Sequence, residues 1–358
     1  MNRRNFLGTA AAAAALSPLY HLPSTSLPST SFPPAGNRMG ISIASYAIRW
    51  KSSEESTSYP AFTDALQVLA HSHSLGAGGV QVSVRGWAKD FAGKVRDTRE
   101  KLEQYLEGQI SLPKSDDEID RFESEVKHAK EAGASILRAV CLSGRRYETF
   151  ESLQSFQSFK ADSLAALERA EPIVRKHRVK LAIENHKDWR IAELIGIMEH
   201  LGSEWMGVTL DTGNNISLLE DPMEVVEKLA PYTFTTHFKD MGMMPYEDGF
   251  LLAEVPLGAG VLDLPKVIAL CKAHNPDVTF NLEMITRDPL KIPCKTDRYW
   301  ETFDHVNGRD LARTLRMAEA TNKSLPQVSN KNPEERLAFE EQNVRSSFVY
   351  ATKHLGLF

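Results

Sequence analysis

Apolar residues along this chain fall into short runs bounded by turn residues, and longer segments with helical periodicity separate the runs. Several runs are nearly continuous and rich in β-branched residues, which is the pattern of strands buried on both faces of a parallel sheet. The pattern predicts strands at 39–45, 79–84, 109–112, 136–142, 180–183, 206–210, 232–236 and 278–282.

The segments between these runs place apolar residues on one face of a helix. Leu66 and Leu69 share a face of the segment 62–75, and Ser115 with Glu118 has the spacing of a capping box at the start of the next helix. Further helices are predicted at about 150–177, 189–201, 221–230, 263–274 and 309–321.

Eight strands alternating with helices indicate an α/β fold, the (β/α)8 TIM barrel, which we assign to 39–321. An open doubly wound sheet is the alternative, but no Gly-x-Gly-x-x-Gly follows the first run. Residues 322–358 are polar at first and then helical from about 333 to 354, which predicts a C-terminal helical extension. Apolar residues in that helix would suit packing on the barrel or self-association into a homo-oligomer.

The N-terminal segment differs in composition from the rest of the chain. Arg3 and Arg4 precede Phe-Leu and an alanine-rich run, an arrangement that resembles a twin-arginine export signal. The Pro-, Ser- and Thr-rich residues that follow are typical of a flexible linker. We therefore exclude 1–38 from the fold and predict export by the twin-arginine route to the periplasm or another extracytoplasmic space. An ordinary disordered or helical N-terminus is the alternative.

Composition narrows the function classes. The chain has 358 residues, 42% apolar and 25% charged, with a net charge of −5. It lacks the basic excess that nucleic-acid binding requires. No run of about 20 apolar residues occurs, so no membrane-spanning helix is predicted. The three cysteines lie in separate segments and indicate no disulfide framework, which suits a protein that folds and takes up metal before export.

Four consecutive predicted strands each end at a side chain that can bind metal. In a (β/α)8 barrel the carboxyl ends of the strands surround the active site, so these side chains should meet at the mouth of the barrel. One acidic residue after an apolar run is more often a helix cap or an ion-pair partner, but four in succession indicate one metal site. The four residues are Glu184, Asp211, His237 and Glu283.

The same segments carry a resemblance to a known family. They read AIENH at 182–186, VTLDTGN at 208–214, THFKD at 236–240 and LE at 282–283. Over about 39–321 the chain resembles the xylose isomerase-like TIM barrels of the sugar phosphate isomerase/epimerase superfamily. That group includes ketose 3-epimerases, hydroxypyruvate isomerase and inosose dehydratase.

The resemblance implies a site and a reaction. In the family, the residues that match Glu184, Asp211, His237 and Glu283 bind one divalent cation. The two glutamates also move the substrate proton beside a carbonyl, which gives an enediolate. Three carboxylates and one imidazole form a hard ligand set that favours Mn²⁺, with Mg²⁺, Co²⁺ or Zn²⁺ as alternatives.

The chain departs from the ketose epimerases at two positions. Those enzymes commonly carry a histidine three residues after the ligand aspartate and an arginine six residues after the ligand histidine. Asn214 and Met243 occupy these places here, which puts the epimerase type of substrate binding in doubt. The missing histidine also argues against a DNA-repair endonuclease of the same fold.

Other residues are candidates for binding the substrate. His186 and Lys239 each follow a metal ligand by two residues, so a continued strand would point them to the same side as that ligand. Alternatively, His186 only supports the site and Lys239 is solvated or paired with Asp240. Arg287 could bind a carboxylate or form a surface ion pair. Asn214 and Tyr46 complete the predicted set, the latter by stacking on a sugar.

Three functions follow from these interpretations. The first is a divalent-metal-dependent sugar isomerase or epimerase that abstracts a proton next to a carbonyl. The second is a lyase of the same family: a dehydratase, a keto-glycoside eliminase or a decarboxylase of an oxo sugar acid. The third is a sugar-binding barrel without activity. Export favours a small non-phosphorylated sugar or sugar acid as the substrate.

Overall fold

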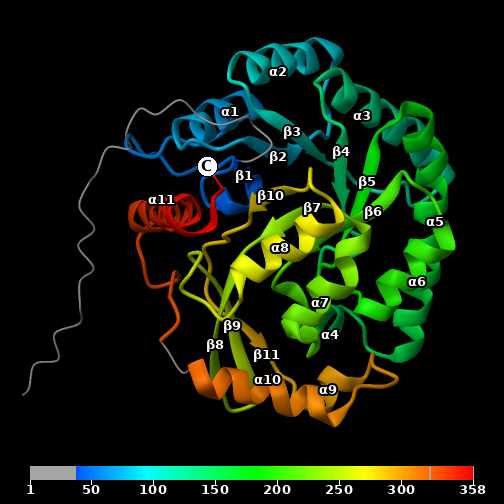
Figure 1. The fold of residues 1–358 in the computed structure, drawn as a ribbon, viewed down its shortest axis with the longest axis vertical. Helices are drawn as coiled ribbons and strands as arrows, with labels where there is room; N and C mark the ends of the chain where they lie inside the picture. Colours follow the sequence, from blue (N-terminus) through cyan, green and yellow to red (C-terminus); the bar gives the residue numbers. More distant parts are fainter. Residues whose placement is uncertain (1–37, 322–323, 358) are drawn as a thin grey trace, which may run out of the picture. The chain divides into compact units, whose positions relative to one another are not determined.

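The computed structural model describes residues 38–321 and 324–357. Eight parallel strands among them form a closed barrel, which confirms the predicted (β/α)8 fold (Figure 1). In their order around the barrel, the strands are β1 (Gly40–Ser42), β10 (Thr279–Leu282), β7 (Thr233–Phe238), β6 (Met206–Asp211), β5 (Lys180–Glu184), β4 (Ile136–Ala139), β3 (Tyr105–Gln109) and β2 (Gly79–Ser83).

Helices connect successive strands and surround the barrel (Figure 1). Their starts follow capping rules: Asp64, Asp221 and Asp263 each accept hydrogen bonds from backbone N–H groups in the first turn of a helix. The helices are α1 (Ala65–Ser74), α2 (Lys89–Lys101), α3 (Ile119–Glu131), α5 (Leu153–His177), α6 (Ile191–Leu201), α7 (Pro222–Leu229) and α8 (Leu264–His274). Helix α2 was not predicted, because this polar helix buries only Ala92 and Val95 and so shows little apolar periodicity.

The third strand begins before its predicted position and overlaps the prediction only at Gln109. The prediction was 109–112, whereas β3 covers Tyr105–Gln109. A buried glutamate, Glu107, interrupts the apolar run there. Its carboxylate accepts hydrogen bonds from Gln81, Thr235 and Asn281 inside the barrel. The period of apolar residues could not indicate a strand whose inward side chain is a satisfied carboxylate.

A second sheet, separate from the barrel, consists of three antiparallel strands, the first of which follows β7 in the sequence. This sheet was not predicted. It consists of β8 (Asp240–Tyr246), β9 (Gly249–Val255) and β11 (Leu290–Ile292), in the order β11-β9-β8. Helix α10 (Gly308–Thr321) lies against it, and the short helices α4 (Arg146–Thr149) and α9 (Asp297–Trp300) are nearby (Figure 1). Buried side chains such as Met243, Phe250 and Tyr299 form its core. This sheet matters because β9 carries an acidic residue, Glu254, into the site described below.

The C-terminal helix predicted from the sequence is present as α11 (Pro333–Tyr350). Its Glu340 carboxylate accepts the backbone N–H groups of Ile48 at 2.7 Å and Arg49 at 3.1 Å, in the segment after β1. Val344 and Phe348 pack into the barrel core. The helix is therefore anchored to the barrel by a buried carboxylate and by apolar contacts.

Two predictions about membranes and export have different outcomes. Among the described residues, no helix combines the length and apolar character needed to span a membrane. The predicted twin-arginine signal and linker lie outside the described residues, so export stays a prediction.

Candidate metal centre and active site

The four predicted metal ligands lie together at the mouth of the barrel. Glu184 and Asp211 are the last residues of β5 and β6, His237 is the next-to-last residue of β7, and Glu283 directly follows β10. One ligand atom from each residue lies within 4.8 Å of the others, and all four side chains are buried. Neighbouring parallel strands end at one edge, which is why residues distant in the sequence converge here. We call these four residues the quartet.

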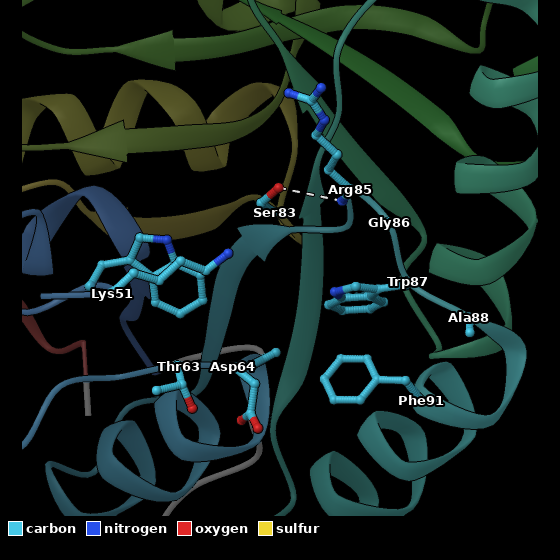
Figure 2. A pocket seen from close by; sticks show the side chains of 11 residues that line it. Lys51, Thr63, Asp64, Ser83, Arg85, Gly86, Trp87, Ala88 and Phe91 are labelled. Carbon is cyan, nitrogen blue, oxygen red and sulfur yellow. Dashed lines mark hydrogen bonds between the residues drawn. The ribbon is translucent and has the colours of Figure 1, made fainter. Parts of the chain in front are cut away.

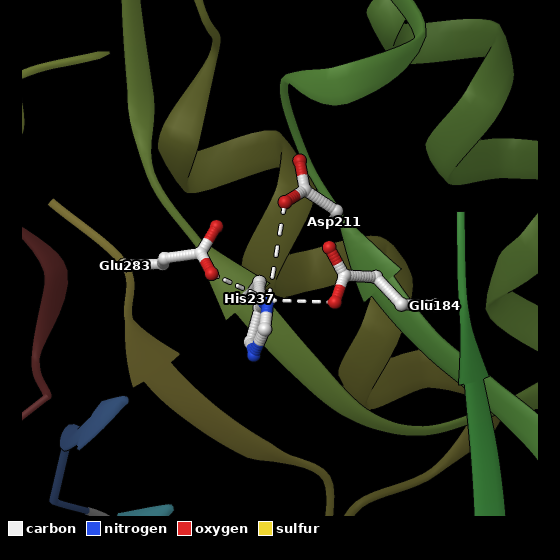
Figure 3. A group of neighbouring side chains, drawn as sticks. All are labelled: Glu184, Asp211, His237 and Glu283. Atoms are coloured by element: carbon white, nitrogen blue, oxygen red, sulfur yellow. Dashed lines mark ion pairs between the residues drawn. The ribbon is translucent and has the colours of Figure 1, made fainter. Parts of the chain in front are cut away.

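His237 stands at the centre of the quartet (Figure 3). Its Nδ1 atom lies 3.2 Å from Glu184 Oε2, 3.0 Å from Glu283 Oε1 and 4.0 Å from Asp211 Oδ2. None of these contacts has the geometry of a hydrogen bond, so Nδ1 is a buried polar atom without a hydrogen-bond partner in the described part of the chain. Three carboxylates facing one imidazole require positive charge between them.

The opposite ring nitrogen of His237 is held from inside the barrel. His237 Nε2 lies 2.7 Å from Gln81 Oε1, and Gln81 Nε2 donates a hydrogen bond to the Glu107 carboxylate at 3.0 Å. Because the amide nitrogen of Gln81 faces a carboxylate, its oxygen faces His237 and accepts a hydrogen bond from the Nε2–H group. When the ring is neutral, this arrangement leaves a lone pair on Nδ1, which is the state that binds a metal.

Two cations and one amide hold the carboxylates of the quartet. Arg138 Nε donates to Glu184 Oε2 at 2.6 Å, and Asn214 Nδ2 donates to Glu184 Oε1 at 3.1 Å. Lys239 Nζ lies 2.7 Å from Asp211 Oδ2 and 2.5 Å from Glu283 Oε2. The quartet is thus surrounded by groups that orient each carboxylate.

The charges of the site shift its pKa values in opposite directions. Burial raises the pKa of Glu283, but His237 and Lys239 outweigh it and hold this pKa well below its usual range. Burial also raises the pKa of Asp211, to about 6, although Lys239 opposes the rise. Burial lowers the pKa of His237, but attraction to Glu283 and Glu184 outweighs burial and brings this pKa to about 9. Without a metal, therefore, a proton on His237 supplies the missing positive charge.

The quartet fits a divalent cation. Its donors are carboxylate oxygens and one imidazole nitrogen that has no hydrogen-bond partner, and all are buried close together. Hard divalent cations prefer such oxygen-rich sets. Glu184, Asp211, His237 and Glu283 are the residues that would hold the ion.

Two of the five predicted substrate-binding residues contact the quartet, and the other three have different surroundings. Asn214 and Lys239 contact the quartet directly. Arg287 pairs with Glu254 of β9, with Nη2 to Oε1 at 2.5 Å. His186 is half-buried, and its buried Nδ1 atom has no hydrogen-bond partner among the described residues. Tyr46 instead contacts the outer helix α1, because its hydroxyl lies 2.8 Å from His71 Nε2.

Three residues of the site were missed by the sequence analysis. Arg138 lies within β4 and looked like an ordinary strand residue. Glu254 comes from the unpredicted sheet, and its carboxylate lies 3.9 Å from Lys239 Nζ. Lys187, three residues after Glu184, is buried and donates a hydrogen bond to Asn214. The sequence offered one indication that Lys187 belongs to the site: it directly follows the AIENH segment at 182–186.

A pocket of about 310 Å³ opens beside the second strand (Figure 2). The side chains that line the pocket include the rings of Trp87 and Phe91, which meet edge to face with their centroids 5.4 Å apart. Ser83 at the end of β2 also lines the pocket. Gln81 points into the barrel towards His237, and alternation along the strand puts Ser83 on the same side. The pocket therefore adjoins the barrel mouth.

The fold and the quartet define a class of protein: an α/β barrel whose strand ends assemble a buried site suited to a divalent cation. Residues 69–302, more than half of the chain, match the family described as xylose isomerase-like TIM barrel, and the chain belongs to that family. Enzymes of this superfamily include epimerases, isomerases and lyases.

Individual relatives are distant. A 104-residue stretch is 29% identical to the 3-oxo-isoapionate decarboxylase of Pectobacterium atrosepticum, and it covers 28% of this chain and 38% of that protein. A D-psicose 3-epimerase structure solved with D-fructose has a TM-score of 0.57 at 12% identity, covering 89% of this chain and 99% of the epimerase. A xylose isomerase-like protein from Mycobacterium smegmatis, in complex with magnesium, has a TM-score of 0.54 at 14% identity, covering 78% and 97% of the two chains. At these identities, the two structures support the fold alone.

Proposed function

We propose that this chain is a divalent-metal-dependent sugar isomerase or epimerase that acts on a non-phosphorylated sugar or sugar derivative. The supporting observation is the placement of two buried glutamates on opposite sides of His237 (Figure 3). Glu184 and Glu283 each bring a carboxylate oxygen within 3.2 Å of the same imidazole nitrogen. A substrate carbon between the two carboxylates could lose a proton to one and regain it from the other.

The residues of the chain supply the acid and base in this proposal. One glutamate takes the proton from the carbon beside the carbonyl, and the C–H electron pair forms a C=C bond as the carbonyl electrons move to oxygen. The other glutamate must carry a proton at this stage; it gives that proton to the opposite face of the carbon, which inverts the carbon. A bound divalent cation would supply positive charge beside the two substrate oxygens that carry the enediolate. Mn²⁺ is our proposed ion.

The surrounding cations prepare the two glutamates for this role. Arg138 and Asn214 orient Glu184, while Lys239 orients Glu283. Burial raises both carboxyl pKa values, but Arg138 and His237 lower that of Glu184, and His237 and Lys239 lower that of Glu283, so that both fall below the usual range. Without substrate, both glutamates are therefore carboxylates. Each can accept a proton only after the substrate or a metal rearranges the local charge.

A lyase is the second candidate, and one observation favours it. A 104-residue stretch of the chain is 29% identical to 3-oxo-isoapionate decarboxylase, which is a lyase. In a decarboxylation, the C–C bond electrons pass into the adjacent carbonyl as CO₂ leaves, and a glutamic acid then protonates the carbon. Dehydration and elimination of a keto-glycoside begin with the same proton abstraction. The site residues would be common to all of these reactions.

Solvent exchange separates the candidates. The Mn²⁺-loaded protein is incubated with candidate keto sugars and oxo sugar acids in D₂O and followed by NMR. Deuterium uptake beside the carbonyl without loss of substrate atoms supports an isomerase or epimerase. Release of water, CO₂ or an aglycone supports a lyase. Binding without exchange or cleavage would leave the sugar-binding barrel and contradict both enzyme proposals.

A matched pair of variants ties the reaction to the site. Glu283→Gln should abolish exchange, because an amide cannot accept the proton. Glu227→Gln is the control, since Glu227 is an exposed residue of α7 paired with Lys266. Glu184→Gln tests the other base, and exchange that survives in both single variants would place the base elsewhere.

Export remains a separate proposal. It rests on Arg3 and Arg4 and the apolar run that follows, and it favours substrates without phosphate. Expression of the full chain in a bacterial host, with fractionation of the periplasm, would test it. An Arg3→Lys, Arg4→Lys variant should remain in the cytoplasm.

A further inference from the structure

Lys187 combines two unfavourable features. Its backbone has φ 78°, in the left-handed region that residues other than glycine rarely adopt. Its side chain is also buried, with the residue only 3% exposed. Burying an ammonium group is costly unless it is paired with an opposite charge. Strain and a buried charge at the same residue are typical of functional sites.

The ammonium group of Lys187 shares its hydrogen-bond acceptor with a second ammonium group. Lys187 Nζ donates a hydrogen bond to Asn214 Oδ1, and Lys239 Nζ donates to the same oxygen at 3.4 Å. The amide nitrogen of Asn214 is engaged with Glu184 at 3.1 Å. Two positive charges therefore converge on one neutral oxygen at the edge of the quartet.

The carboxylates around Lys187 are already paired with other cations. Glu184 pairs with Arg138, Glu254 pairs with Arg287, and Lys239 bridges the other two carboxylates of the quartet. Among the residues that the structure describes, no carboxylate forms an ion pair with Lys187.

The neighbouring acid, Asp188, does not compensate for this charge. Its carboxylate accepts the backbone N–H groups of Leu142 at 3.2 Å, His186 at 3.1 Å and Trp189 at 2.8 Å. Burial lowers the pKa of Lys187, repulsion from Lys239 and Arg287 lowers it further, and the result is about 8. Glu254 and Asp211 attract this charge, but neither forms an ion pair with it. Lys187 is thus a mostly charged ammonium group without an anionic partner among the residues that the structure describes.

We propose that Lys187 binds a carboxylate group of the substrate, so that the substrate is a polyhydroxylated sugar acid rather than a neutral sugar. The identification of this anion as the substrate rests on the proposed function; the anion site itself does not. The anion would complete the ion pair that Lys187 lacks and would lie beside the quartet through Asn214. A carboxylate fits because its two oxygens could engage Lys187 and the neighbouring Lys239 together.

Two probes that differ in one group test the site. D-gluconate and D-glucitol share the same hydroxylated chain, but D-glucitol carries CH₂OH in place of the carboxylate. Isothermal titration should show the wild-type protein binding gluconate at least about tenfold more tightly than glucitol. Lys187→Met should remove most of that preference and leave glucitol affinity within about twofold. Lys266→Met, at an exposed lysine of α8, should behave as wild type.

The contribution of the metal is separated by repeating the titrations after EDTA treatment. Carboxylates bind metals as well as ammonium groups, so a preference that depends only on the metal would disappear without it. Our proposal requires that a difference between wild type and Lys187→Met persist in the metal-free protein. Equal gluconate affinity for wild type and Lys187→Met, or equal affinity of wild type for both probes, would overturn the proposal.

A second measurement covers the case in which Lys187→Met fails to fold. Wild-type protein with ¹³C-labelled lysine ε-carbons is titrated with base, and Lys187→Arg identifies the resonance. Gluconate should raise the pKa of Lys187 by about one unit, whereas glucitol should not change it. An unchanged pKa would contradict the anion site.

The two proposals fail in different ways. If deuterium exchange is absent but the gluconate preference depends on Lys187, the anion site stands and the proposed reaction is wrong. If exchange occurs with neutral keto sugars and Lys187→Met has no effect on binding, the reaction stands and the anion site is wrong.

Discussion

Glu107 and Glu283 are both buried in the same barrel, yet their surroundings differ. The Glu107 carboxylate accepts hydrogen bonds from neutral groups of Gln81, Thr235, Thr279 and Asn281. We call these five residues the interior network. Burial raises the pKa of Glu107, and its neutral donors only moderate this rise. For Glu283, His237 and Lys239 reverse the effect of burial.

This difference separates a structural carboxylate from one suited to binding. In the interior network, neutral donors surround a single carboxylate, so its hydrogen-bonding requirements are met without a metal. In the quartet, three carboxylates converge on a histidine nitrogen that has no hydrogen-bond partner. The charge balance there is completed only by a proton or a cation. Burial alone therefore does not identify a functional acid, whereas the nature of its partners does.

The largest expected effect comes from removing charge from the quartet. Glu184→Gln with Asp211→Asn should weaken Mn²⁺ binding by at least about 1000-fold, more than the 10–100-fold typical of residues that only support metal ligands. Isothermal titration of Mn²⁺ measures this change. The control is Glu227→Gln with Asp277→Asn, two exposed acids. If metal binding is unchanged in the quartet variant, the quartet does not bind the metal, and it does not differ from the interior network in the way described.

Gln81 links the two regions, and its replacement should have an intermediate effect. Gln81→Met removes the acceptor for His237 Nε2 and a donor to Glu107. We expect Mn²⁺ affinity to fall by about 10–100-fold, because the tautomer of His237 is no longer held. Gln67→Met, on the exposed surface of α1, should leave affinity unchanged. If Gln81→Met binds Mn²⁺ as wild type does, the orientation of His237 is set by other contacts.

Glu107→Gln should change stability more than metal binding. We expect a loss of about 1–2 kcal/mol at acidic pH, because an amide cannot accept all of the hydrogen bonds that the carboxyl group now receives. Burial places the folded-state pKa of Glu107 above its unfolded value. Its contribution to stability is therefore full below the unfolded pKa and is lost as pH rises through the folded pKa.

Urea unfolding of the metal-free protein from pH 4 to pH 8 checks this sign. The free energy of unfolding of wild type minus that of Glu107→Gln should decrease as pH rises, by at most about 1.4 kcal/mol per pH unit for one proton. A difference that grows with pH would mean that cations, rather than neutral groups, control this carboxylate.

The smallest effect is expected from one hydroxyl of the interior network. Thr235→Val preserves shape but removes the hydrogen bond that Thr235 Oγ1 donates to Glu107 at 2.9 Å. The free energy of unfolding should fall by about 1 kcal/mol, and Mn²⁺ affinity should stay within about twofold. A large loss of metal affinity would show that the network and the quartet act as one unit.

The sequence was sufficient to predict the barrel and the position of the quartet. Parallel strands buried on both faces leave nearly continuous apolar runs, and the chain must alternate them with helices. Glu184, Asp211, His237 and Glu283 stand at the ends of such runs, and parallel strands bring their ends together. That inference needed only the period of the strands, which is a local property of the chain.

The tertiary structure alone decided the charges around the quartet. Arg138 reaches Glu184 across neighbouring strands, and Glu254 arrives from a sheet outside the barrel pattern. Lys187 turns inward through a left-handed backbone, which no period of apolar residues reveals. The strand that contains Glu107 was misplaced in the prediction, because the neutral donors that satisfy this carboxylate come from other strands. Local pattern determines where a strand ends, whereas the partners of a buried charge depend on contacts between residues distant in the sequence.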